Sequence, residues 1–168
     1  MMNQAHLHLL FNHLPILGVF FGLLVLAGGF FLKNNSVKRT ALGIFVLSGV
    51  FAIPAYLTGE GAEEVVEGIA GVSENLIERH EELANIFLSL AGALGLIAVA
   101  TLYADLKWRK FAPVLYALTF AVATGAMVFA QQAGSSGGEI RHSEIRTGSA
   151  AASLESGSNV GKAEENDD

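Results

Sequence analysis

Long apolar runs separated by short polar segments make up most of this chain. Four of these runs contain no Asp, Glu, Lys or Arg, and they cover about residues 8–32, 40–57, 83–103 and 111–130. Each run holds about 18–25 residues, which at 1.5 Å per residue suffices to cross a hydrocarbon core of about 30 Å. Pro15 and Pro113 lie near the beginning of their runs, where a helix tolerates proline best. The pattern predicts an all-α membrane protein, an up-down bundle of four transmembrane helices.

The composition agrees with this class and excludes several functions. Hydrophobic residues make up 52% of the 168 residues, charged residues only 15%, and the mean hydropathy is +0.47. With a net charge of −6 and no basic surface to follow a phosphate backbone, no nucleic-acid partner is expected. The absence of cysteine excludes thiolate metal sites, iron–sulfur clusters and thioether-attached haem. No nucleophile elbow, phosphate loop or helical H-E-x-x-H motif indicates a hydrolase.

The basic residues set the expected orientation in the lipid bilayer. They gather in two short connections between the apolar runs: Lys33, Lys38 and Arg39 in the first, and Lys107, Arg109 and Lys110 in the second. Such loops stay in the cytoplasm, so both termini and residues 59–82 are expected outside. The opening residues carry no Lys or Arg, so we interpret the first run as a retained membrane span and not as a signal peptide.

Residues 59–82 and the end of the chain have a different, acidic composition. Apolar residues recur at helical spacing in the first of these segments, which predicts a short interfacial helix at about 61–70. Ser73 is expected to cap a second helix that continues into the third span. A Gly-rich turn at 134–138 is expected to fold back over the bundle. We therefore expect a transmembrane domain at 1–142 and a disordered tail at 143–168.

The five histidines are the residues best suited to carry chemistry, because imidazole is a common metal ligand. They are His6, His8, His13, His80 and His142, and the predicted topology puts all of them on the outer side. Counted along straight helices, His13 lies about 28 Å above Leu32 and His80 about 34 Å above Tyr103. His13 and His80 are therefore expected at similar heights. His6 shares the helix face of His13, whereas His8 is expected to point elsewhere and to contribute less.

These positions leave several functions open. The first hypothesis is an electron-transfer protein that binds b-type haem, or another metal, through His13 and His80, with His142 and His6 as replacement ligands. Glu81 and Glu82 would then orient a ring, and other membrane or periplasmic redox subunits would be the partners. The second is an accessory subunit without a cofactor, whose Gly and Ala faces dock on a larger membrane complex. The third is a divalent cation binder at the acidic outer segment.

The same residues resemble a family of small bacterial four-helix membrane domains of unknown function. The matching stretches are His6-Leu7-His8 with His13-Leu14-Pro15-Ile16, then His80-Glu81-Glu82-Leu83-Ala84, then Gly137-Gly138-Glu139-Ile140-Arg141-His142. They correspond to an H-F-P-I motif that opens the first span, a His that opens the third, and a G-G motif with a nearby His after the fourth. The resemblance covers about residues 5–145 and departs at Leu14 and in the longer acidic segment. It implies a bacterial inner-membrane protein, points to His13 and His80, and supplies no established activity.

Overall fold

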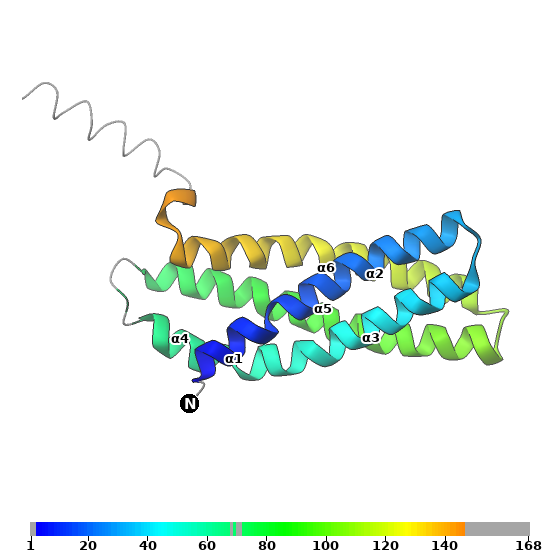
Figure 1. Ribbon diagram of the computed structural model, residues 1–168, viewed down its shortest axis with the longest axis horizontal. Helices are drawn as coiled ribbons and strands as arrows, with labels where there is room; N and C mark the ends of the chain where they lie inside the picture. Colours follow the sequence, from blue (N-terminus) through cyan, green and yellow to red (C-terminus); the bar gives the residue numbers. More distant parts are fainter. Residues whose placement is uncertain (1–2, 68, 70–71, 147–168) are drawn as a thin grey trace, which may run out of the picture.

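The structure, a computed structural model, describes residues 3–67, 69 and 72–146, and within these ranges every regular element is helical. The elements are α1 (Gln4–Phe11), α2 (His13–Phe31), α3 (Asn35–Leu57), α4 (Gly59–Glu67), α5 (Glu74–Lys107), α6 (Ala112–Arg141) and a 3-10 turn η1 (Ser143–Ile145). Four helical segments, α1 with α2, α3, α5 and α6, are long and apolar enough to cross a membrane. They run side by side as a bundle (Figure 1). The predicted all-α four-helix architecture is confirmed.

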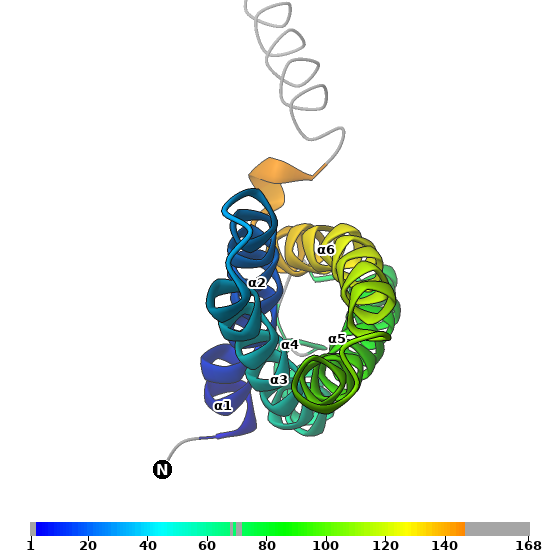
Figure 2. The same ribbon diagram turned by 90° about the vertical axis from the view of Figure 1, so that its right-hand side faces the viewer.

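Seen end-on, α2, α3, α5 and α6 follow one another around the bundle, so α2 and α5 lie on opposite sides (Figure 2). The α2–α3 and α5–α6 hairpins are tightly packed, and α3 also packs closely on α5. Two glycines allow this approach: a Cβ built on Gly49 would lie 3.2 Å from the Cα of Gly95, and one on Gly95 would lie 3.3 Å from the Cα of Gly49. The seam between α2 and α6 is looser.

The two hairpins are built alike. The buried residues of α2 are Pro15, Val19, Gly22, Leu26 and Gly29, and a shift of 72 residues carries each onto a buried residue of α5: Phe87, Ala91, Leu94, Ala98 and Thr101. A shift of 78 residues carries five of the six buried residues of α3 onto buried residues of α6. The exception is Leu42, whose counterpart Phe120 is 38% exposed. The bundle is therefore a structural repeat of two hairpins with the same packing register.

The repeat also explains why one seam is tight and the other loose. In this register, Gly95 of α5 corresponds to Leu23 of α2, and Gly49 of α3 corresponds to Met127 of α6. Leu23 and Met127 are partly buried against the core. Because backbones approach closely only where side chains are small, the glycine pair closes the α3–α5 seam and the larger pair holds α2 and α6 apart.

Several boundaries differ from the sequence-based expectation. The Gly-rich segment 134–138 was expected to form a turn, but α6 continues through it to Arg141. Tertiary contacts outweigh the low helix propensity of glycine here, because Ser136 is buried on the side facing α5 and hydrogen-bonds to His80. The helix predicted at about 61–70 is α4, Gly59–Glu67. Ser73 lies at the N-cap of α5 as expected, although its side chain makes no capping hydrogen bond.

The end of the domain also extends past the predicted boundary at 142. After α6 the chain folds back in η1, and Arg146 donates hydrogen bonds to the carbonyls of Glu139, at 2.8 Å, and Ile140, at 3.1 Å. Carbonyls at a helix end have no partner within the helix, so Arg146 caps α6. Residues 143–146 therefore belong to the folded unit, and the rest of the predicted tail, 147–168, lies outside the described residues.

Candidate functional site

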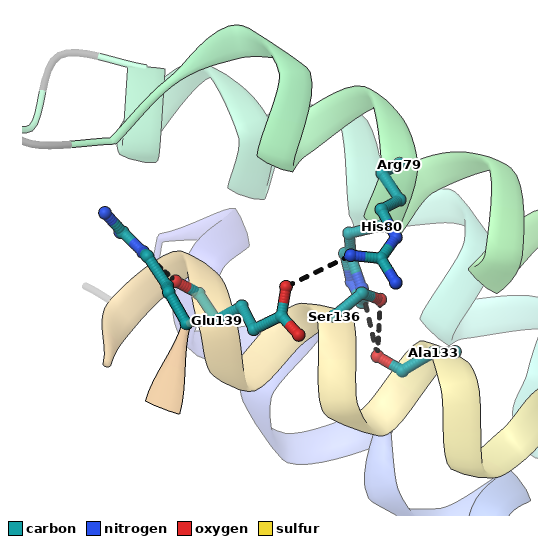
Figure 3. Close-up of polar contacts among 6 residues, drawn as sticks. Arg79, His80, Ala133, Ser136 and Glu139 are labelled. Atoms are coloured by element: carbon teal, nitrogen blue, oxygen red, sulfur yellow. Dashed lines mark hydrogen bonds and ion pairs between the residues drawn. The ribbon is translucent and has the colours of Figure 1, made fainter. Parts of the chain in front are cut away.

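At the end of the bundle where α5 begins and α6 ends, His80 is held by two hydrogen bonds (Figure 3). Its Nδ1 lies 3.1 Å from the carbonyl oxygen of Ala133 and 3.1 Å from Oγ of Ser136. The ring also lies against Gly137, where a Cβ would come within 2.9 Å of Cε1. One turn of α6 thus provides an acceptor, a hydroxyl and a flat surface for a single imidazole.

His8 has the same environment in the first hairpin. Its Nδ1 lies 3.1 Å from the carbonyl oxygen of Ala55 and 3.3 Å from Oγ1 of Thr58. The glycine that follows, Gly59, would place a Cβ 3.9 Å from Cε1 of His8. The shifts of 72 and 78 residues that relate the buried faces carry these residues onto His80, Ala133, Ser136 and Gly137. The repeat therefore extends from the packing register to the surroundings of each histidine.

These contacts settle which ring nitrogen of each histidine carries the proton. A backbone carbonyl only accepts hydrogen bonds, so the Nδ1 that faces it must be the donor. In a neutral imidazole the other nitrogen, Nε2, then has a free lone pair. No described residue hydrogen-bonds to Nε2 of either ring. This is the arrangement of a metal-ligating histidine, in which a carbonyl on one nitrogen orients the other toward the metal.

His8 and His80 also lie at the same end of the bundle. They come from α1 and from the beginning of α5 (Figure 1). The sequence-based pair was His13 and His80, but His13 is exposed at the first residue of α2. His8 precedes the buried Pro15 by seven residues, so both lie on the inner helix face, whereas His13, five residues after His8, points away. The structure thus gives His8 and His80 matching hydrogen-bonded surroundings at one end of the bundle and leaves His13 exposed.

The other predicted residues lie at the periphery of this end. His6 is exposed and contacts Asn3, at 2.6 Å between Nδ1 and Oδ1. His142 is also exposed, with its Nδ1 2.9 Å from a carboxylate oxygen of Glu144. Glu81 and Glu82 are exposed, and within the described residues neither forms a hydrogen bond or ion pair with His80. The carboxylate near the site is Glu139, which bonds to Arg79 at 3.2 Å and ties the beginning of α5 to the end of α6 (Figure 3).

An acidic rim surrounds this end of the bundle. Desolvation, followed by the negative charges of Glu81, Glu67, Glu60 and Glu78, raises the pKa of the Glu63 carboxyl above its ordinary value of 4.5. The rim thus holds several negative charges that disfavour the ionised form of Glu63. Within the described residues, however, no group of three or more His, Asp or Glu side chains is arranged to hold a metal ion. The predicted divalent cation site thus has no ligand set in the part of the chain that the structure describes.

Sequence reasoning missed His8, Thr58, Ser136 and the two glycines, yet two signals for them were present. The first is spacing: His8, Pro15, Gly22 and Gly29 recur every seven residues, and a heptad keeps to one helix face. The second is a short motif, Ala-x-x-Thr-Gly at 55–59, which returns as Ala-x-x-Ser-Gly at 133–137. Together they predict one inward histidine and one glycine-backed acceptor in each half.

Comparison with known proteins adds no assignment: no family model, curated protein or solved structure matches the chain. The resemblance to the bacterial four-helix membrane domains stays a prediction.

Proposed function

We propose that this protein is a membrane electron-transfer protein that binds one b-type haem between His8 and His80. The observation that supports it is the duplicated arrangement in which each Nδ1 is bonded to a backbone carbonyl, Ala55 or Ala133, and each Nε2 is left free. Two oriented imidazoles, one from each hairpin, would hold the haem iron.

The number of ligands favours haem over a bare metal ion. A structural or catalytic ion bound only by protein usually takes three or four side chains. The porphyrin supplies four nitrogens to haem iron, so two histidines complete the coordination. The described residues offer a pair of histidines and no group of three ligands, which fits haem and replaces the earlier pair, His13 and His80.

Each residue of the site then has a defined task. His8 and His80 would bind the iron, while the carbonyls of Ala55 and Ala133 and the hydroxyls of Thr58 and Ser136 would hold the rings in the ligating tautomer. A haem bound there would supply one-electron redox chemistry. The acidic rim faces the compartment from which a redox partner subunit would dock. By the positive-inside rule, we place this end outside the bacterial inner membrane, with both termini on the same side.

The experiment is an optical and paramagnetic spectrum of the full chain purified after expression with haem and metals supplied. We expect a Soret band, a sharp α band on reduction, and a low-spin ferric signal typical of two imidazole ligands. His8→Ala and His80→Ala should each abolish or shift the Soret band, and free imidazole should restore part of it in His80→Ala.

His13→Ala is the matched control, because it removes an exposed imidazole five residues from His8 and should leave the spectrum unchanged. A colourless, metal-free protein that is still folded would refute the proposal and favour an accessory subunit without a cofactor. Loss of the Soret band in His13→Ala, with the band retained in His8→Ala, would instead restore the pair expected from the sequence alone.

A further inference from the structure

The second hairpin is longer than the first at the end opposite the histidines. The shift between the halves grows from 72 residues along α2 and α5 to 78 along α3 and α6, so the second hairpin has six more residues between its packed faces. Four of them extend α5 to Lys107, beyond the counterpart of the end of α2. The connection 108–111 is one residue longer than 32–34, and α6 begins one residue earlier than the counterpart of α3. Arg39 of α3 anchors the extension through an ion pair of 2.6 Å with the buried Asp105. The repeat itself does not need this addition.

Residues of this connection line an apolar cavity of about 370 Å³, which lies between the end of α5 and the beginning of α6. The cavity is lined by Ala100, Tyr103, Ala104, Trp108, Phe111 and Val114, together with one leucine of α6. Tyr103 and Trp108 meet edge to face, with ring centroids 5.2 Å apart, and both are about half exposed. Aromatic residues of this kind gather where a membrane span meets the headgroup region. The cavity therefore opens toward lipid at the boundary of the bilayer.

The segment that lines this cavity carries basic residues and no acidic ones. The ammonium group of Lys110 lies 4.8 Å from the centroid of the Phe111 ring, which forms one wall. Lys107, the last residue of α5, and Arg109 are neighbours of Trp108 in the sequence, and residues 106–112 contain no acid. Asp105, the acidic residue that precedes this segment in the sequence, is paired with Arg39. A ligand that suits this place has an apolar tail for the cavity and an anionic head for the lysine.

We propose that the cavity binds an anionic phospholipid, with an acyl chain along Trp108 and the headgroup phosphate at Lys110. The lipid covers the apolar walls of the α5–α6 corner, and the basic loop selects its charge. One basic residue near an anionic lipid surface changes affinity about fivefold. The site is separate from the histidine end and stands whether or not the protein carries haem.

Trp108 is the single tryptophan of the chain and reports on the cavity directly. The full chain is reconstituted in phosphatidylcholine vesicles that contain increasing fractions of a dibrominated lipid, either phosphatidylglycerol or phosphatidylcholine, and Trp108 fluorescence is measured. We expect brominated phosphatidylglycerol to quench with an association constant about fivefold higher than that of brominated phosphatidylcholine.

Three variants separate a selective site from ordinary lipid contact. Lys110→Gln should bring the two association constants close together. Ala100→Leu should weaken quenching by both lipids, because the exposed Ala100 lines the cavity and leucine fills it. Lys33→Asn is the charge-matched control from the other basic loop, and asparagine tolerates the left-handed backbone of Lys33, whose φ is 50°. Equal quenching by the two lipids, or a preference that survives in Lys110→Gln, would overturn the proposal.

Discussion

Two glycines one turn apart on α6 allow a direct test of how His80 is held. A Cβ built on Gly137 would lie 2.9 Å from Cε1 and 3.2 Å from Nδ1 of His80, whereas one built on Gly134 meets nothing within 4 Å. Both residues are inside α6 and neither has an unusual φ. Gly137→Ala and Gly134→Ala therefore change helix propensity equally and differ only in the contact with the imidazole.

The expected difference follows from two opposing effects. Alanine in place of a helical glycine stabilises by about 0.8–1 kcal/mol, and Gly134→Ala should gain this amount. Gly137→Ala gains the same but forces a methyl group into the His80 ring, and overpacking of this kind costs about 1–3 kcal/mol. If the ring moves, its hydrogen bonds to Ala133 and Ser136 are lost as well, at about 1 kcal/mol each. Gly137→Ala should thus be about 1–5 kcal/mol less stable than Gly134→Ala.

The free energy of unfolding is measured in mixed detergent micelles by titration with a denaturing detergent, with helicity read from circular dichroism. A double-mutant cycle then assigns the cause. In a His80→Ala background the ring is gone, so the penalty for Gly137→Ala should vanish and the two glycine variants should become equally stable. If the two variants are already equally stable with His80 present, the ring does not lie on Gly137 and the geometry of the site is wrong.

Other predictions concern topology, the end of α6 and the acidic rim. Because the chain has no native cysteine, single labels at Ser36→Cys and Ser73→Cys should react oppositely with an impermeant thiol reagent in intact cells, and only Ser73→Cys should react from outside. A chain that ends at Arg146 should keep the full unfolding free energy, whereas Arg146→Ala should lose about 1 kcal/mol with the capping hydrogen bonds. The raised pKa of Glu63 means that the folded state binds its proton more tightly, so stability falls as pH rises above 4.5 through the folded-state pKa. Glu63→Gln should therefore melt higher than the wild type at pH 7 and equally at pH 4, while Glu64→Gln, at an exposed position, should show no such difference.

The four spans were predictable because their evidence is spread over many residues. A run of about 20 apolar residues without charge has few alternatives to a transmembrane helix, and no single contact changes that result. The ends of the helices depend on few residues and were predicted less well. Gly137 and Gly138 are typical of a turn, yet α6 continues through them because the space beside Gly137 is occupied by the His80 ring. Glycine is favoured both in turns and where a neighbouring side chain packs closely on a helix, and only the folded structure shows which of the two applies.

The choice between His8 and His13 shows a second limit. Height along a straight helix favoured His13, but facing direction decides which side chain enters the bundle. The helix is interrupted at Asn12, between α1 and α2. Asn12 lies three residues before Pro15, whose ring and missing N–H disturb the preceding turn. The number of residues between a histidine and a buried residue predicts its facing direction better across this interruption than a height counted along a straight helix. His8 precedes the buried Pro15 by about two turns. The hydrogen bond from His8 to Ala55 joins residues 47 apart and cannot be read from spacing.

The repeat constrains the proposed ligand more than either histidine does alone. A shift that carries His8 onto His80, and Ala55 onto Ala133, relates two half-sites by an approximate twofold axis along the bundle. A single group bound equally by both imidazoles must then lie near that axis, where it meets equivalent neighbours from each hairpin. The two halves differ in the tight and loose seams, in the α4 helix that begins at Gly59, and in the six extra residues before α6. Selection for a packed bundle alone would not require Thr58 and Ser136 to face the same ring atom in both halves, whereas a shared ligand on the axis would.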